Sequence, residues 1–205
     1  MGMLAVGGVW TAINASRAYE LTRGPDPKPW KVVKNWAAYR DGLHLGADDP
    51  GVTIVAFMDP SCGACRRLVQ QVLPLLERYP REVALSVRSF PLRLSAASPD
   101  AVAAMHCVGE QHAGWTYIEG LYGGTEDTVP NAIALASDEV ADSAIFWQCM
   151  RATNGDSLLR RALDDASRLG VHLVPTILVN AAMYRGLPEG FVQAVESRLA
   201  GERAP

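Results

Sequence analysis

Two cysteines separated by two residues are the feature of this sequence that most directly suggests chemistry. Cys62 and Cys65 enclose Gly63 and Ala64 and follow shortly after the apolar run 52–57. That run is short and rich in β-branched residues, which is typical of a strand buried on both faces. After the second cysteine, apolar side chains recur at helical spacing. The pair is therefore expected where a central strand passes into the first turn of a helix.

A thiolate is favoured at such a position. The first backbone N–H groups of a helix have no intrahelical partner, and the helix dipole adds a partial positive charge. We therefore expect Cys62 to ionise more readily than a free thiol and to act as the nucleophile. Arg66 would add to this effect if its side chain folds back. Cys65 can then attack the sulfur of a mixed disulfide and release the partner, so the predicted chemistry is thiol–disulfide exchange.

The same two thiols could instead bind a metal. A zinc site needs further cysteine or histidine ligands, but the sequence has no second CxxC or HxxxH pattern, and His106 and His112 are six residues apart. Transfer of Cu(I) through two soft thiolates is chemically possible. The sequence favours disulfide exchange without a metal or organic cofactor, and a metal-thiolate carrier stays open as an alternative.

Composition limits the classes of protein to consider. The chain has 205 residues, of which 49% are hydrophobic and 20% charged, and its formal net charge is −3. These values fit one large globular domain, or a core domain with an insertion. The basic residues are scattered, so no nucleic-acid partner is expected. The four cysteines suffice for one redox pair and one structural bridge.

A second motif lies far downstream. Pro175 directly precedes an apolar run that ends at Asn180. Proline is poorly tolerated inside a central strand, so Pro175 should mark the first residue of a strand here.

The sequence between the two motifs is predicted to be mostly helical. A strand is expected over 83–90. Ser98 and Pro99 are then typical of an N-cap and the first position of a helix. Further helices are expected over 141–151 and 157–169 from the spacing of apolar residues. This helical stretch is too long for a plain strand–helix–strand core.

Together, these motifs resemble the DsbA-like branch of the thioredoxin superfamily. The resemblance covers roughly residues 30–199, and the runs 103–111 and 146–150 also look like that branch. It implies an α/β thioredoxin fold with an inserted helical subdomain. On this basis we expect one thioredoxin-like domain over 30–205, with the helical insertion at about 95–168.

The resemblance also implies residue roles. The Val174–Pro175 peptide bond should be cis and packed beside Cys62 and Cys65. The backbone of Val174 should offer β-type hydrogen bonds to a bound substrate strand. The resemblance also implies that Gly63 and Ala64 contact the substrate.

The implied function is thiol–disulfide oxidoreductase activity outside the bacterial cytoplasm. Protein thiols and disulfides would be the substrates, and a membrane redox partner is expected. Val174 and the helical insertion favour an oxidase that introduces disulfides, although the dipeptide Gly63-Ala64 matches that of neither thioredoxin nor DsbA. A reductase or isomerase is the alternative, and a peptide-binding chaperone is an alternative of another class, as is the metal carrier.

The two remaining cysteines are Cys107 and Cys149. The resemblance implies that they form a structural disulfide between two helices of the insertion. An oxidising compartment would favour such a bridge. The alternative is that they are two separate buried thiols that pack as small hydrophobic residues.

Three positions depart from the family pattern. Ala56 stands six residues before Cys62, where the family often has a buried acid that exchanges protons with the second cysteine. Val174 stands where isomerase-type members more often have threonine. Asn180-Ala181 replaces the Asn-Gly pair of a tight turn, so a looser turn is expected.

The N-terminal residues 1–29 allow two interpretations. The apolar segment is either an amphipathic helix or the trimmed remnant of a membrane anchor, since it is shorter than the roughly 20 apolar residues needed to span a bilayer. A proline-rich linker over 25–29 follows. The folded domain should therefore begin near Trp30.

Overall fold

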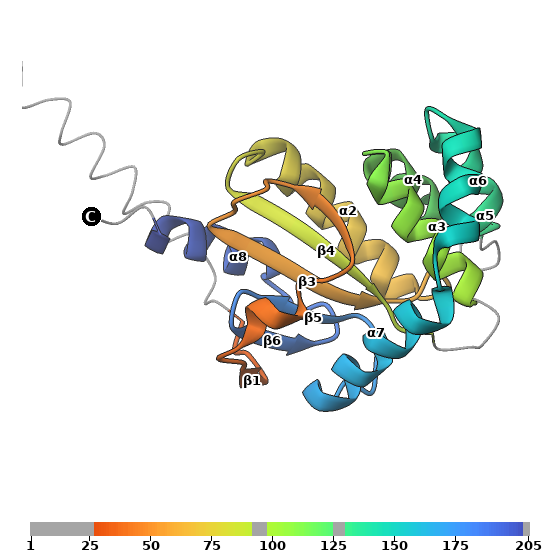
Figure 1. The fold of residues 1–205 in the computed structure, drawn as a ribbon. Coiled ribbons are helices and arrows are strands. Elements are labelled where there is room, and N and C mark those ends of the chain that lie inside the picture. Colours follow the sequence, from red (N-terminus) through yellow and green to blue (C-terminus); the bar gives the residue numbers. More distant parts are fainter. Residues whose placement is uncertain (1–26, 92–97, 125–129, 203–205) are drawn as a thin grey trace, which may run out of the picture.

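A mixed β-sheet forms the centre of the molecule. The computed structural model describes residues 27–91, 98–124 and 130–202, and within these residues six strands pair in the order β1-β6-β5-β3-β4-β2 (Figure 1). Only β3 and β4 run parallel among these neighbouring strands. The strands are β1 (Lys31–Val32), β2 (Leu43–Gly46), β3 (Val52–Met58), β4 (Val83–Ser89), β5 (Thr176–Val179) and β6 (Ala182–Arg185).

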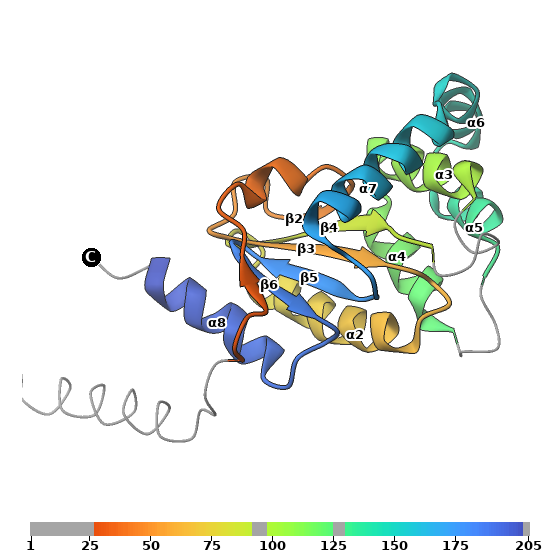
Figure 2. The same cartoon turned by 90° about the horizontal axis from the view of Figure 1, so that it is seen from below.

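Helices cover both faces of this sheet and also extend beyond it (Figures 1 and 2). Helices α3 to α7 all lie between β4 and β5 in the sequence, which confirms a thioredoxin fold with a helical insertion. The helices are η1 (Trp36–Tyr39), α2 (Gly63–Arg78), α3 (Pro99–Glu110), α4 (Gly114–Gly123), α5 (Ala132–Glu139), α6 (Ser143–Ala152), α7 (Gly155–Leu169) and α8 (Phe191–Glu202).

Strand β3 is buried along its whole length, as its sequence predicted. Ile54 and Ala56 pack into the larger apolar cluster, to which α2 and α8 contribute. Val55 and Phe57 point to the other face and pack with residues of η1 and α7. Figure 2 shows α2 and α8 on one side of the sheet and α7 on the other. The strand that leads to Cys62 is therefore held from both sides.

Side-chain caps set the starts of the insertion helices. The Ser98 hydroxyl accepts a hydrogen bond from the Ala101 N–H at 3.1 Å, and α3 begins at Pro99 as predicted. Helix α6 begins at Ser143 rather than at 141, because the Asp142 carboxylate caps it. Helix α7 begins at Gly155 rather than at 157, because the Asn154 side chain provides its cap.

Cys107 on α3 and Cys149 on α6 form a disulfide, as the resemblance implied. Their Cα atoms are 5.8 Å apart, and 42 residues separate them in the sequence. Cys107 is completely buried in the larger apolar cluster. The bridge therefore ties one helix of the insertion to the cluster that also contains the redox pair.

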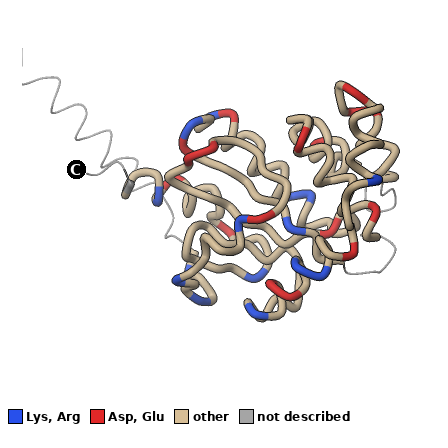
Figure 3. Tube along the Cα trace, in the orientation of Figure 1, with Lys and Arg blue, Asp and Glu red and all other residues tan. Residues whose placement is uncertain are grey.

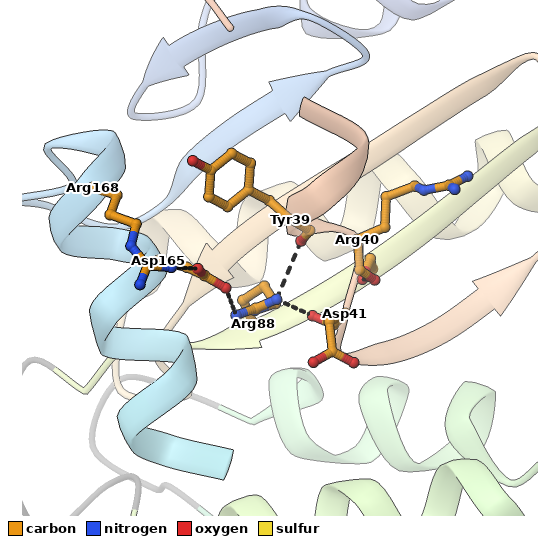
Figure 4. Close-up of polar contacts among 7 residues, drawn as sticks. Tyr39, Arg40, Asp41, Arg88, Asp165 and Arg168 are labelled. Atoms are coloured by element: carbon orange, nitrogen blue, oxygen red, sulfur yellow. Dashed lines mark hydrogen bonds and ion pairs between the residues drawn. The ribbon is translucent and has the colours of Figure 1, made fainter. Parts of the chain in front are cut away.

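A buried arginine connects the insertion to the sheet (Figure 4). Arg88 on β4 forms an ion pair with Asp165 of α7, with Nη2 and Oδ2 2.7 Å apart. Its Nη1 donates to the backbone carbonyls of Tyr39 and Asp41. Arg168, which is largely exposed, also pairs with Asp165. Because Arg88 is almost fully buried, these partners satisfy a charge that would otherwise be costly to bury.

The turn between β5 and β6 is not loose, contrary to the sequence-based expectation. Val179 pairs with Ala182, so only Asn180 and Ala181 form the turn. Asn180 adopts a positive φ of 47°, which asparagine tolerates. Its side-chain oxygen accepts from the Thr53 N–H at 2.8 Å, and its side-chain nitrogen donates to the Gly51 carbonyl. These bonds to the start of β3 hold the turn without a glycine.

The sheet begins close to the predicted start of the domain. The Trp30 N–H donates to the Met183 carbonyl at 2.8 Å, immediately before β1. The predictions for residues 1–26 lie outside the described residues.

None of the helices in the described part of the chain has the length and apolar character needed to cross a membrane. Acidic and basic residues are both scattered over the described part of the trace (Figure 3).

Removing the Cys107–Cys149 bridge should destabilise the protein. For a closed loop of this length, the chain-entropy model gives a loss of about 4 kcal/mol in the free energy of unfolding. The Cys107→Ala/Cys149→Ala variant should show this loss in urea denaturation. A loss below about 1 kcal/mol would mean that the bridge contributes little to the stability of the insertion.

Candidate active site

Cys62 lies at the N-cap of α2, in the position that the sequence predicted. Its backbone is extended, with φ −91° and ψ 114°, and its sulfur accepts a hydrogen bond from the Cys65 N–H at 3.2 Å. This N–H belongs to the first turn of α2 and also donates to the Cys62 backbone carbonyl at 3.0 Å. The arrangement therefore directs a helix-terminal donor at the sulfur that we predict to be the nucleophile.

The loop between β3 and α2 is held by Asp59. Its carboxylate oxygen Oδ1 accepts from the Ser61 N–H at 2.7 Å and from the Ser61 hydroxyl at 2.6 Å. Its backbone carbonyl accepts from the Cys62 N–H at 3.0 Å. Arg66 does fold back, and its Nη1 donates to the Pro60 carbonyl at 3.1 Å. These bonds fix the short turn that places Cys62 at the cap.

The two cysteines differ in burial and in acidity. Cys62 is 8% exposed, whereas Cys65 is 0% exposed. Burial raises the pKa of the Cys65 thiol far above its usual range, and the neighbouring Cys62 sulfur raises it further. Cys65 therefore stays protonated at neutral pH. Of the two cysteines, only Cys62 has any exposed surface through which a partner could reach it.

The loop before β5 brings a backbone carbonyl to the same sulfur. The Val174–Pro175 peptide bond is cis, as the resemblance implied. The Cys62 thiol donates to the Val174 carbonyl, with sulfur and oxygen 3.6 Å apart. The Thr176 hydroxyl donates to the Leu173 carbonyl at 2.7 Å, which holds the loop in place. Residues 112 positions apart in the sequence thus meet at the redox pair.

The remaining sequence-predicted residues also lie at this site. Gly63 and Ala64 form the start of α2 and are partly exposed, next to the Cys62 sulfur. Val174 is partly exposed as well, and Pro175 is buried. The Val174–Pro175 loop and the start of α2 therefore meet at the Cys62 sulfur.

Two tyrosines of α4 were missed by the sequence reasoning. Tyr117 and Tyr122 are buried in the same apolar cluster as Cys62 and Cys65. Burial raises the pKa of Tyr122 above its usual value, and the charge of Cys65 raises it further. The helical spacing of Tyr117 and Leu121 could have predicted α4, but not its position behind the redox pair.

The described residues contain no group of three or more histidine, cysteine, aspartate or glutamate side chains arranged to hold a metal ion.

Comparison with known proteins identifies the family. The sequence profile of the thioredoxin family matches residues 39–196, which is most of the chain. The chain belongs to the thioredoxin family. The matched region includes β3, the CxxC pair, the whole insertion and the strand after Pro175. No curated protein sequence matches the chain significantly.

Solved structures of thioredoxin-like proteins share this fold. A thioredoxin-like oxidoreductase from Silicibacter pomeroyi is 23% identical, with a TM-score of 0.65 over 83% of this chain and 98% of that one. A periplasmic thioredoxin-like protein from Salmonella enterica serovar Typhimurium is 22% identical, with a TM-score of 0.61 over 78% and 91%. Pseudomonas aeruginosa DsbA2 is 20% identical, with a TM-score of 0.59 over 80% and 96%. This chain thus shares the thioredoxin-like fold of these proteins.

The difference in burial predicts different rates of alkylation. In the reduced native protein, Cys62 should react with iodoacetamide well before Cys65, because Cys65 is sealed and protonated. Mass spectrometry of the digested protein at successive times would give both rates. In denaturant the two rates should become similar. Faster labelling of Cys65 in the native protein would contradict the assignment of Cys62 as the nucleophile.

Proposed function

We propose that this chain is an extracytoplasmic thiol–disulfide oxidoreductase that introduces disulfides into protein substrates. The observation that carries the proposal is the position of the Cys62 sulfur. This sulfur accepts a hydrogen bond from the Cys65 N–H at the start of α2 and lies 3.6 Å from the Val174 carbonyl, on a residue that is 8% exposed. A thiolate can be stabilised at this position and can be reached by a cysteine of another protein.

The proposed reaction starts from the Cys62–Cys65 disulfide. A substrate thiolate attacks the Cys62 sulfur, and Cys65 leaves and takes up a proton. A second substrate thiolate then attacks the substrate sulfur of this mixed disulfide, which forms the substrate disulfide and releases Cys62 as a thiolate. Two electrons have passed from the substrate to the cysteine pair. A membrane redox partner would accept them and restore the Cys62–Cys65 disulfide.

The substrate is proposed to bind in extended form beside the Val174–Pro175 loop. The backbone of Val174 provides β-type hydrogen bonds to the chain that carries the reacting cysteine. Gly63 and Ala64 have small side chains and lie partly exposed next to the Cys62 sulfur, which leaves space for a protein substrate. Pro175, which follows Val174 through a cis peptide bond, is buried.

Two observations support a location outside the cytoplasm. A structural disulfide such as Cys107–Cys149 persists in oxidising compartments and is rare in reducing ones. The structurally similar Salmonella protein is described as periplasmic. The direction of exchange is proposed as oxidation because of Val174 and the helical insertion, and reduction or isomerisation of protein disulfides is the alternative.

A metal-thiolate carrier would use the same cysteines without exchanging disulfides. Such a carrier would retain stoichiometric Zn²⁺ or Cu(I) when the reduced protein is purified without added metal. A peptide-binding chaperone would instead keep its activity when Cys62 is replaced. Both outcomes differ from those expected of an oxidoreductase.

A trapping experiment tests the proposed function. Reduced Cys65→Ser protein should capture a peptide that contains a disulfide as a stable mixed disulfide through Cys62, because the sulfur that would release it is missing. The product should be visible by mass spectrometry and should disappear with dithiothreitol. Cys62→Ser is the matched control and should capture nothing. Capture by Cys62→Ser, or no capture by Cys65→Ser, would contradict disulfide exchange through this pair.

A further inference from the structure

A cavity of about 60 Å³ lies where helices α3 and α7 of the insertion meet strands β2 and β4 of the sheet. None of the residues that line it belongs to the cysteine site described above. The apolar part of its lining consists of Leu43, Val87, Val102, Met105, Leu158 and Ala162. One water takes up about 30 Å³ of liquid, so this space has room for a chain of about two or three carbon atoms.

The two helices present the same combination of side chains to this cavity. On each helix the lining residues are spaced i, i+3 and i+4, which places them on one face. On each helix, two of these residues are apolar and the third is basic. The basic residues are His106 on α3 and Arg161 on α7, and both are exposed. The cavity therefore combines an apolar interior with basic groups that water can reach.

Arg161 is the cation that is available to a ligand. Within residues 27–91, 98–124 and 130–202, its guanidinium forms no hydrogen bond and no ion pair. Arg88 also lines the cavity, but Asp165 and two backbone carbonyls hold its guanidinium (Figure 4). A guanidinium can bind a carboxylate through two parallel hydrogen bonds. Arg161 can therefore bind a carboxylate at the cavity without giving up another contact.

One carboxylate also lines the cavity. Asp41 is exposed in the turn before β2, and its charge opposes an anionic ligand. Asp165 does not line the cavity and is shared between Arg88 and Arg168, at 2.7 and 3.1 Å. Among the charged lining residues and the ion pairs to which they belong, three guanidinium groups therefore face two carboxylates. This balance favours an anionic ligand over a cationic one.

We propose that this cavity binds a short aliphatic carboxylate. The hydrocarbon chain lies among the apolar side chains of α3, α7, β2 and β4, and the carboxylate binds the Arg161 guanidinium. His106 donates its ring N–H to the same carboxylate. This chemistry is shared by a small free acid and by the C-terminal residue of a peptide that ends in an aliphatic side chain. The bound group contacts both the insertion and the sheet, and its binding does not depend on the cysteine pair.

Titration of the isotope-labelled full-length chain with butanoate, followed by amide NMR spectra, tests this site. Butanoate should shift the amide signals of the lining residues in a saturable way. Acetate has the same charge but a shorter chain, so it should bind about tenfold more weakly. Butylamine has the opposite charge and should also bind more weakly than butanoate. A peptide that ends in valine, with a free or an amidated C-terminus, separates the two sources: tighter binding of the free form indicates a C-terminal residue, and binding of butanoate alone indicates a small acid.

Four variants complete the test. Arg161→Gln should weaken butanoate binding by about fivefold, whereas the matched control Arg160→Gln, an exposed neighbour outside the lining, should not change it. Asp41→Asn should tighten binding by about twofold, because it removes the opposing charge. Ala162→Leu should fill the cavity and abolish binding.

If Ala162→Leu does not fold, as judged by circular dichroism, the comparison of Arg161→Gln with Arg160→Gln decides alone. No saturable binding of butanoate, equal effects of these two arginine variants, or binding of butylamine as tight as that of butanoate would overturn the proposal.

Discussion

The site depends on the hydrogen bond between the Cys65 N–H and the Cys62 sulfur at the first turn of α2. This bond requires α2 to begin at Gly63, a few residues after β3 ends at Met58. The intervening loop is kept short by Asp59, whose side chain and carbonyl both accept bonds from the residues that follow. Because β3 is packed on both faces, this junction cannot shift without disturbing both apolar clusters.

The same junction makes the two cysteines unequal. Cys62 stands at the N-cap and keeps a small exposed fraction, whereas Cys65, in the first turn of α2, is completely buried. Cys62 is therefore accessible and supplied with a backbone donor, and Cys65 is enclosed with its proton. The Val174–Pro175 loop then meets Cys62 from the opposite side, so that one sulfur lies between a helix terminus and a backbone acceptor. An ordered two-step exchange follows from this asymmetry.

Local signals in the sequence predicted the parts of the fold that local chemistry determines. The apolar run of β3, the cap at Ser98 and the proline before β5 each have a direct physical reason at their own positions. The short strands β1, β2 and β6 were not predicted, because strands of two to four residues are stabilised by their partners rather than by their own pattern. The turn at Asn180 was wrongly expected to be loose, because its bonds to residues near the start of β3 depend on the tertiary structure.

In the candidate site, too, the sequence predicted the features that depend on local chemistry and missed those that depend on tertiary contacts. The sequence predicted the cysteine pair and its placement, since both follow from one strand and one helix. It could not predict that Tyr122 packs behind the pair, because the contact between α4 and α2 depends on how the insertion folds over the core. Nor could it predict the pairing of Arg88 with Asp165, which joins residues 77 positions apart.

The equilibrium reduction potential of the Cys62–Cys65 pair, measured against glutathione, tests the central claim most directly. Stabilisation of the Cys62 thiolate favours the reduced pair, and about 30 mV corresponds to about 1.4 kcal/mol of such stabilisation. An enzyme that introduces disulfides should therefore have a potential above about −200 mV, while the Cys107–Cys149 bridge stays intact during the titration. A potential near or below about −270 mV would contradict oxidation as the direction of this reaction.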